Sequence, residues 1–214
     1  MRTWRWLGVL ALAVVGCQPV PHGFERVKPV VRPMGRTLAI LPFSPGKDGN
    51  ATVVDGIKLA EYAAIELQVA LLREKTKVLG PSAMREALKE GVNEARWTDI
   101  GRQAGAKLLV VGEVTYLDMH FDKLIQAREG VIGVEFRVLD VTTRPAKSLA
   151  RVNWRLMFPE GAGEKFESRY AEMKPEIFRN EMVKFAATRV ARIFFEYRQR
   201  RGPSSQLEAT WRVE

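Results

Sequence analysis

The sequence predicts an α/β protein: a two- or three-layer sandwich with a mixed sheet of about five strands, an antiparallel hairpin and a long C-terminal helix. Three observations predict this class. Short apolar runs and amphipathic segments follow one another in the order β α β α α β β β α. Apolar and polar residues alternate on both sides of a short turn near residue 145. An apolar stripe with helical period runs through residues 176–198.

The first folded element is expected at residues 36–43, where the run RTLAILPF is short, apolar and closed by a proline, as is typical of a buried strand. The glycine- and proline-rich SPGKDGN after it predicts a loop. Residues 57–75 predict a helix, and residues 76–82 predict a second short strand. The helix prediction depends on four residues that share one face at spacings of three and four: Ala60, Ala64, Leu67 and Leu71.

Two shorter helices are expected next. Ser82 is a suitable N-cap for a helix that stops at Gly91. Thr98 or Asp99 is expected to cap a further helix, which ends at Gly105. That glycine leads into residues 106–119, AKLLVVGEVTYLDM, the strongest strand signal in the chain.

Residues 131–143 and 147–158 are expected to form an antiparallel hairpin. A symmetric turn would place Phe136 opposite Trp154 on the buried face and Glu135 opposite Arg155 on the solvated face. The inward positions of the two arms alternate with polar ones: Ile132, Val134, Phe136, Val138, Ala150, Val152, Trp154, Leu156 and Phe158.

The N-terminus has the pattern of a secretory signal. Arg2 and Arg5 precede ten uncharged residues, Leu7 to Gly16, which as a helix would reach only about 15 Å, half of a bilayer core. Val14-Val15-Gly16-Cys17 resembles the lipobox of bacterial lipoproteins. The resemblance implies cleavage before Cys17 and acylation of that cysteine with chains of the palmitate type, which would anchor the protein to a membrane. A buried N-terminal helix and a free structural cysteine are the alternatives.

Four segments are therefore expected: a signal peptide at 1–16, the lipidated Cys17 with a proline-rich tether to residue 35, a single α/β domain at 36–198, and a basic, flexible tail at 199–214. Gln18 after the cysteine favours the periplasmic face of the outer membrane. Removing the signal leaves 32 basic and 25 acidic residues and no second cysteine, so the domain would have no disulfide. Such a charge suits an anionic surface or polymer, and the export signal argues against nucleic acid.

The domain itself resembles the periplasmic modules of the CsgG, LpoB and TolB-N-terminal type. The resemblance is carried by RTLAILPF, TKVLGPSAMREAL, DIGRQAGAKLLVVGEV and RVLDVTT, and it spans about residues 36–158 plus the final helix. It implies a periplasmic α/β fold. Members of these families differ in activity, so the resemblance implies a role in the cell envelope without choosing one.

No enzymatic constellation is visible in the sequence. His22 lies in the tether and His120 stands alone at a strand end. No Cys/His cluster suggests zinc, and GAGEK at 161–165 lacks the spacing of a phosphate loop. Three acids near strand ends are expected to be turn caps or solvated ends: Asp118, Asp122 and Asp140. We therefore expect no catalytic residue, no metal and no cofactor.

The predicted function is that of a non-enzymatic, lipid-anchored envelope protein that binds a protein or an anionic polymer as a scaffold, assembly factor or regulator. The candidate partner-binding residues lie on the solvated hairpin face, with only Glu135 to offset them: Arg137, Lys147, Arg151 and Arg155. An ordinary solvated sheet face is the alternative for this patch.

Two other functions remain open. One is an oligomeric outer-membrane export component of CsgG type, and a homo-oligomer is compatible with it. Two expected loops, residues 120–130 and 160–176, argue against this function, because a membrane-crossing hairpin needs roughly 9–11 alternating residues in each strand. The other is a hydrolase acting on an envelope polymer, for which the combined change His120→Ala and Asp118→Asn would be the discriminating variant.

Overall fold

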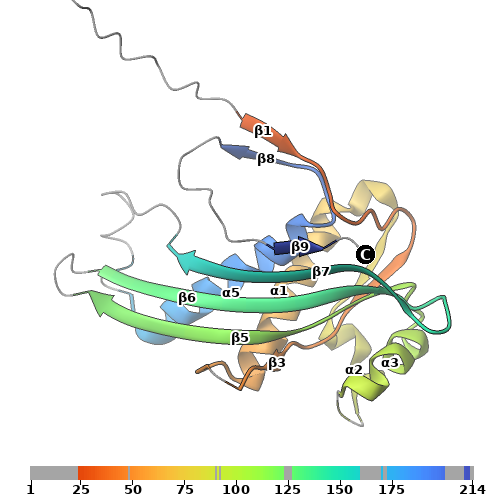
Figure 1. The fold of residues 1–214 in the computed structure, drawn as a ribbon, viewed down its shortest axis with the longest axis horizontal. Helices are drawn as coiled ribbons and strands as arrows, with labels where there is room; N and C mark the ends of the chain where they lie inside the picture. Colours follow the sequence, from red (N-terminus) through yellow and green to blue (C-terminus); the bar gives the residue numbers. More distant parts are fainter. Residues whose placement is uncertain are drawn as a thin grey trace, which may run out of the picture.

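A computed structural model describes residues 24–47, 49–89, 91, 93–122, 127–159, 170, 173–200 and 210–212. The predicted class is confirmed: the chain folds as a mixed α/β sandwich, with a curved sheet that is packed against two long helices (Figure 1). Among the described residues, no helix combines the length and the apolar character needed to cross a bilayer.

The main sheet has the strand order β4-β2-β5-β6-β7-β9. β2 is parallel to β4 and to β5, whereas β5, β6, β7 and β9 are antiparallel to their neighbours. The two-residue β3 follows β2 and pairs with β5 in parallel. The bounds are β2 Thr37–Ile40, β3 Ser44–Pro45, β4 Lys77–Leu79, β5 Leu108–Asp122, β6 Ala127–Asp140, β7 Lys147–Phe158 and β9 Thr210–Arg212.

One face of this sheet is covered by α1 (Val53–Ala70) and α5 (Pro175–Arg192), which pack on each other and on the sheet. The predicted helical face of α1 and the inward positions of β6 and β7 are all buried here. Aromatic side chains fill the space between the layers, among them Phe43, Phe136, Trp154, Phe178 and Phe194. Removal of this apolar area from water is the main stabilising term of the fold.

Among the described residues, helices cover the opposite face at one end only. There α2 (Arg85–Leu88) and α3 (Trp97–Gln103) lie over a smaller apolar cluster, which contains Leu79, Met84, Ile100 and Leu109. Beyond these helices the outward residues of β7, such as Arg151 and Arg155, are exposed. The molecule therefore has three layers at one end and two layers at the other.

The hairpin of β6 and β7 is confirmed, but its predicted register is wrong by two residues. Trp154 lies opposite Val134, and Glu135 lies opposite Asn153. A shift of register between Val138 and Leu139 makes the turn asymmetric, which a symmetric count could not anticipate. Trp154 still contacts Phe136 diagonally, with ring centroids 5.3 Å apart in an edge-on arrangement.

The segment 120–130, treated above as a loop, is largely strand. β5 continues to Asp122 and β6 begins at Ala127, so the two strands form a hairpin of 15 and 14 residues. Each residue from His120 to Asp122 pairs with a residue of β6, so the two strands extend beyond the predicted strand end at Met119. The charged side chains that the structure describes in this segment, those of Arg128 and Glu129, therefore lie along paired strands.

The ends of the domain also differ from the expected boundaries. β1 (Phe24–Val27), which was assigned to the tether, pairs antiparallel with β8 (Tyr197–Arg200). Val30 and Val31 donate backbone hydrogen bonds to the Ile193 carbonyl, and Val31 is buried. The final helix ends at Arg192, six residues earlier than expected, because the chain turns there and enters β8. Part of the expected tail, residues 210–212, forms β9 against β7.

The predicted caps were wrong at two helices. Ser82 lies in a 3-10 turn, η2 (Pro81–Met84), and makes no side-chain cap. Thr98 and Asp99 lie inside α3 rather than before it. Gly91 and Gly105 do adopt the left-handed conformation that ends a helix, with φ of 84° and 70°.

Candidate binding groove

A groove of about 1010 Å³ opens where β2 and β4 end. In open α/β sheets, ligands bind outside the carboxyl ends of parallel strands, which is where this groove lies. The strands β5, β6 and β7 form its floor, and the loop after β2 and the start of α1 form one wall. The opposite wall comes from η2, α2 and α3. Lining residues include Pro42, Phe43, Val53, Ile57, Glu61, Ser82, Arg85, Trp97, Glu113, Glu135, Arg137 and Arg151.

Direct backbone contact between α1 and the loop after β2 builds the first wall. The Phe43 amide donates a hydrogen bond of 3.2 Å to the Gly56 carbonyl. A Cβ at position 56 would lie 1.8 Å from the Phe43 carbonyl oxygen, so glycine alone permits this approach. The position of Phe43 in the groove therefore depends on the first turn of α1.

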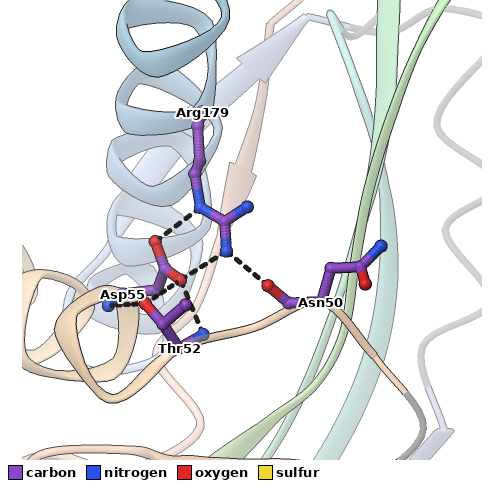
Figure 2. Close-up of polar contacts among 4 residues, drawn as sticks. All are labelled: Asn50, Thr52, Asp55 and Arg179. Carbon is purple, nitrogen blue, oxygen red and sulfur yellow. Dashed lines mark hydrogen bonds and ion pairs between the residues drawn. The ribbon is translucent and has the colours of Figure 1, made fainter.

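A polar network holds that first turn in place (Figure 2). Thr52 and Asp55 form a capping box, in which the Asp55 carboxylate accepts from the Thr52 amide at 2.7 Å. Arg179 of α5 donates to both carboxylate oxygens of Asp55, at 2.9 and 2.6 Å, and also to the Asn50 carbonyl. The guanidinium thus ties α5 to the start of α1 and to the loop before it.

Asp55 is only 4% exposed, yet it is held as an anion. Burial acts to raise its pKa, but hydrogen bonds from Arg179 and Thr52, together with the guanidinium charge, outweigh burial and lower the pKa to about 2. The same pairing raises the pKa of Arg179. We call these four residues the Asp55 clamp: Asn50, Thr52, Asp55 and Arg179.

Two arginines from the hairpin reach the groove. Arg151 donates to Glu135 across the strands, with Nε 2.9 Å from Oε1. The Arg137 guanidinium lies 5.3 Å from the ring centroid of Trp97, within the range of a cation–π contact. Trp97 and Arg137 also line a second hollow of about 470 Å³, so they form the ridge between the two.

The opposite wall is joined to α1 through Glu61. Its carboxylate accepts a hydrogen bond from the Ser82 amide at the start of η2. The close packing of Gly80 against this carboxylate leaves little room for a larger residue, since an added Cβ would lie 2.7 Å from Oε2.

Three carboxylates and three guanidinium groups line the groove, so its charge is balanced: Glu61, Glu113, Glu135, Arg85, Arg137 and Arg151.

The four residues of the predicted patch are only partly brought together. Arg137 and Arg151 face each other and line the groove. Arg155 lies further along the same face, with its guanidinium 5.4 Å from the centroid of Tyr116. Lys147 lies at the turn end of β7, opposite Asp140. Cys17, the predicted lipidation site, lies outside the described residues.

The other polar candidates are dispersed. His120 is exposed, and its Nε2 lies 3.4 Å from Glu129. Asp118 accepts from the Tyr116 hydroxyl and the Met119 amide, and Asp140 caps the turn through Thr142. The bond from Thr142 lowers the pKa of Asp140. His22 and residues 161–165 lie outside the described part, as does the side chain of Asp122. Within the described residues, no three His, Cys, Asp or Glu side chains form a group that would hold a metal.

An apolar strip extends from the groove along the outside of α1. Its residues recur at helical spacing and are between 39% and 75% exposed; we call them the α1 stripe: Val54, Ile57, Ile65, Val69 and Leu72. Leu72 belongs to η1 (Leu72–Glu74), the 3-10 turn after α1. Ile57 lines the groove, so the two surfaces are continuous.

Sequence reasoning missed most of the groove. Arg85 and Trp97 line it, but no local pattern marks them, because they come from separate segments that only the fold assembles. One available signal was the Pro-Phe pair at the end of the first strand. The carboxyl ends of parallel strands are a general place for ligands, and this pair follows such an end.

No protein-family profile matches the chain, and no curated protein matches it. Similar solved structures include a PelC dodecamer from Paraburkholderia phytofirmans, 12% identical, covering 81% of this chain and 97% of that one at a TM-score of 0.45. Lipoprotein GNA1162 from Neisseria meningitidis is 16% identical, covering 73% and 98% at 0.42. The hypothetical protein CT253 from Chlamydia trachomatis is 11% identical, covering 74% and 96% at 0.41. These likenesses are too distant to carry a functional conclusion.

Proposed function

We propose that the protein is a non-enzymatic, lipid-anchored protein of the cell envelope that binds a segment of a partner protein in its groove. The groove is the observation that carries this proposal. It is large enough for several side chains, and the proline, phenylalanine and tryptophan side chains of its lining lie beside paired charges. Cys17, acylated as its lipobox-like context predicts, would supply the anchor.

The balanced charge of the groove favours a protein segment over an anionic polymer. A polyanion would meet three carboxylates beside the three guanidinium groups. A peptide with both polar and apolar side chains suits this lining better. Glu135 and Arg151 neutralise each other as an ion pair, and Trp97 presents an aromatic face. The partner is therefore expected to present both apolar and charged side chains.

The test is co-purification of partners with the detergent-extracted protein after charge reversal in the groove. Arg137→Glu combined with Arg151→Glu should reduce the recovered partner at least tenfold, since each change removes a groove cation and places a like charge beside Glu135. Thermal unfolding of the variant checks that it is folded: Arg151 is exposed, whereas Arg137 is half-buried against Trp97, so a modest decrease in the melting temperature is expected.

Arg155→Glu combined with Arg73→Glu is the matched control, with the same change of net charge outside the groove. Retained partner in the control and lost partner in the groove variant would support the proposal. Equal recovery from wild type and groove variant would refute it. Loss in both would mean that the partner responds to overall charge rather than to the groove.

A second candidate is an oligomeric component of an export assembly, and the α1 stripe favours it. Five apolar residues on one exposed helix face are a surface that a second copy could cover. Native mass spectrometry of the extracted protein should then give a closed oligomer, and Ile65→Lys with Val69→Lys should convert it to the monomer. Lys107→Glu with Glu86→Lys, both exposed and outside α1, keeps the stripe and should leave the oligomer intact.

A further inference from the structure

The two-stranded ribbon of β1 and β8 stands apart from the main sheet (Figure 1). We call residues 24–36 and 192–200 the basic ribbon. They contain seven basic and two acidic residues: Arg26, Lys28, Arg32, Arg36, Arg192, Arg198 and Arg200 against Glu25 and Glu196. One of the seven, Arg36, is ion-paired with Asp140 of β6 at 3.4 Å. Such a density of one sign exceeds the mean of the chain and attracts anions.

The register of the ribbon places like charges side by side. Arg26 lies directly opposite Arg198, and both side chains are exposed. Like charges in opposed positions of an antiparallel pair destabilise the pairing. The ion pair of Arg26 with Glu196, at 3.6 Å on the surface, offsets little of this repulsion. An anionic surface outside the molecule would offset the rest.

The sequence also places the ribbon next to the anchor. Only six residues separate Cys17 from Phe24, so even a fully extended chain brings β1 within about 25 Å of the acylated cysteine. A segment this short keeps the ribbon within reach of the membrane surface but does not by itself orient the domain. The groove lies elsewhere: in Figure 1 the ribbon is at the top, whereas β3, α2 and α3 are at the bottom, with the main sheet between them.

We propose that the basic ribbon docks on the anionic headgroups of the membrane that holds the lipid anchor, and so orients the domain with its groove away from the bilayer. This inference rests on the anchoring part of the proposed function. Basic residues near an anionic membrane each strengthen binding about fivefold, so three of them contribute roughly a hundredfold.

The test uses the full-length, acylated protein reconstituted in vesicles of phosphatidylcholine with or without phosphatidylglycerol. Cys17 is the only cysteine, so one introduced thiol can be labelled selectively once Cys17 is acylated. Glu196→Cys places a fluorophore on the ribbon, and Lys89→Cys places one beside α2; both side chains are exposed. Lipids with a quencher in the headgroup then report which label is near the surface.

We expect the ribbon label to be quenched more than the α2 label in vesicles that contain phosphatidylglycerol. Pure phosphatidylcholine, high salt, or the triple change Arg26→Glu, Lys28→Glu and Arg198→Glu should abolish the difference. The triple change Lys58→Glu, Arg73→Glu and Lys107→Glu has the same charge effect elsewhere and should preserve it. Equal quenching of the two labels in wild type, or a difference that survives the ribbon variant, would overturn the inference.

The intact mass of the extracted protein separates this inference from the proposal on which it rests. A mass without acyl chains would refute the lipid anchor. Salt-sensitive sedimentation of that unacylated protein with phosphatidylglycerol vesicles, reduced about a hundredfold in the ribbon variant, would still support the docking surface. No sedimentation of the unacylated protein would overturn both.

Discussion

Asp55 shows how a single buried charge can be both costly and indispensable. Its capping box alone would need no burial, but the Arg179 guanidinium, from a helix far along the sequence, encloses the carboxylate. An isolated carboxylate in this position would be strongly penalised, whereas this one has partners at both oxygens. The clamp therefore joins α1, α5 and the loop that carries Asn50. The position of the groove wall at the start of α1 depends on these contacts.

Replacing the carboxylate should make this dependence measurable. We predict that Asp55→Asn lowers the free energy of unfolding by about 3 kcal/mol at neutral pH, because Arg179 would keep its charge and lose its counter-ion. Asp99→Asn removes an exposed acid beside Arg102 and should cost less than about 0.5 kcal/mol. Urea unfolding of the three proteins provides the comparison.

The same carboxylate sets a pH dependence with a defined sign. Its pKa is lowered from 3.8 to about 2, so its contribution to stability is complete above pH 4 and is lost as the pH falls toward 2. The stability difference between wild type and Asp55→Asn should thus shrink across this window. A difference that stays constant down to pH 2 would contradict the clamp.

Among the elements, α1 contributes to the most parts of the structure. Its buried face fills the core, its start forms a groove wall, and its outer face is the α1 stripe. Local patterns predicted its buried face correctly, because helical periodicity is a property of consecutive residues. They missed its start at Val53, where Thr52 and Asp55 form the cap. They also missed Gly56. Glycine is required there only because the loop at Phe43 packs against it, and no local pattern reveals that contact.

Gly56→Ala is predicted to disturb this element at one defined contact. The added methyl would meet the Phe43 carbonyl, so the loop must move, at a cost of about 2 to 3 kcal/mol in unfolding free energy, and partner recovery should fall with it. Gly101→Ala in α3 is the control. Its methyl would meet only the Leu109 side chain at 3.2 Å, so stability and partner recovery should change little. Equal effects of the two changes would argue against a rigid wall.

At the scale of the whole molecule, the sequence predicted the layers and the alternation of β6 and β7, because both follow from periodic burial. It did not predict the hairpin register, since the shift at Val138 breaks the count. It could not pair β1 with β8 either, because nothing in Phe24–Val27 identifies a partner near the other end of the chain. The groove was missed for the same reason: it joins residues from Pro42 to Arg151.

The pairing of β1 with β8 also fixes the order in which the protein can mature. A chain that emerges from its amino end presents Phe24–Val27 long before Tyr197–Arg200, so β1 must wait for β8 before it can pair. Bringing such distant segments together is entropically slow, and it cannot begin before residues 197–200 have been synthesised or translocated. The strand next to an acylated amino terminus would therefore remain unpaired in the emerging chain until residues 197–200 are available to it.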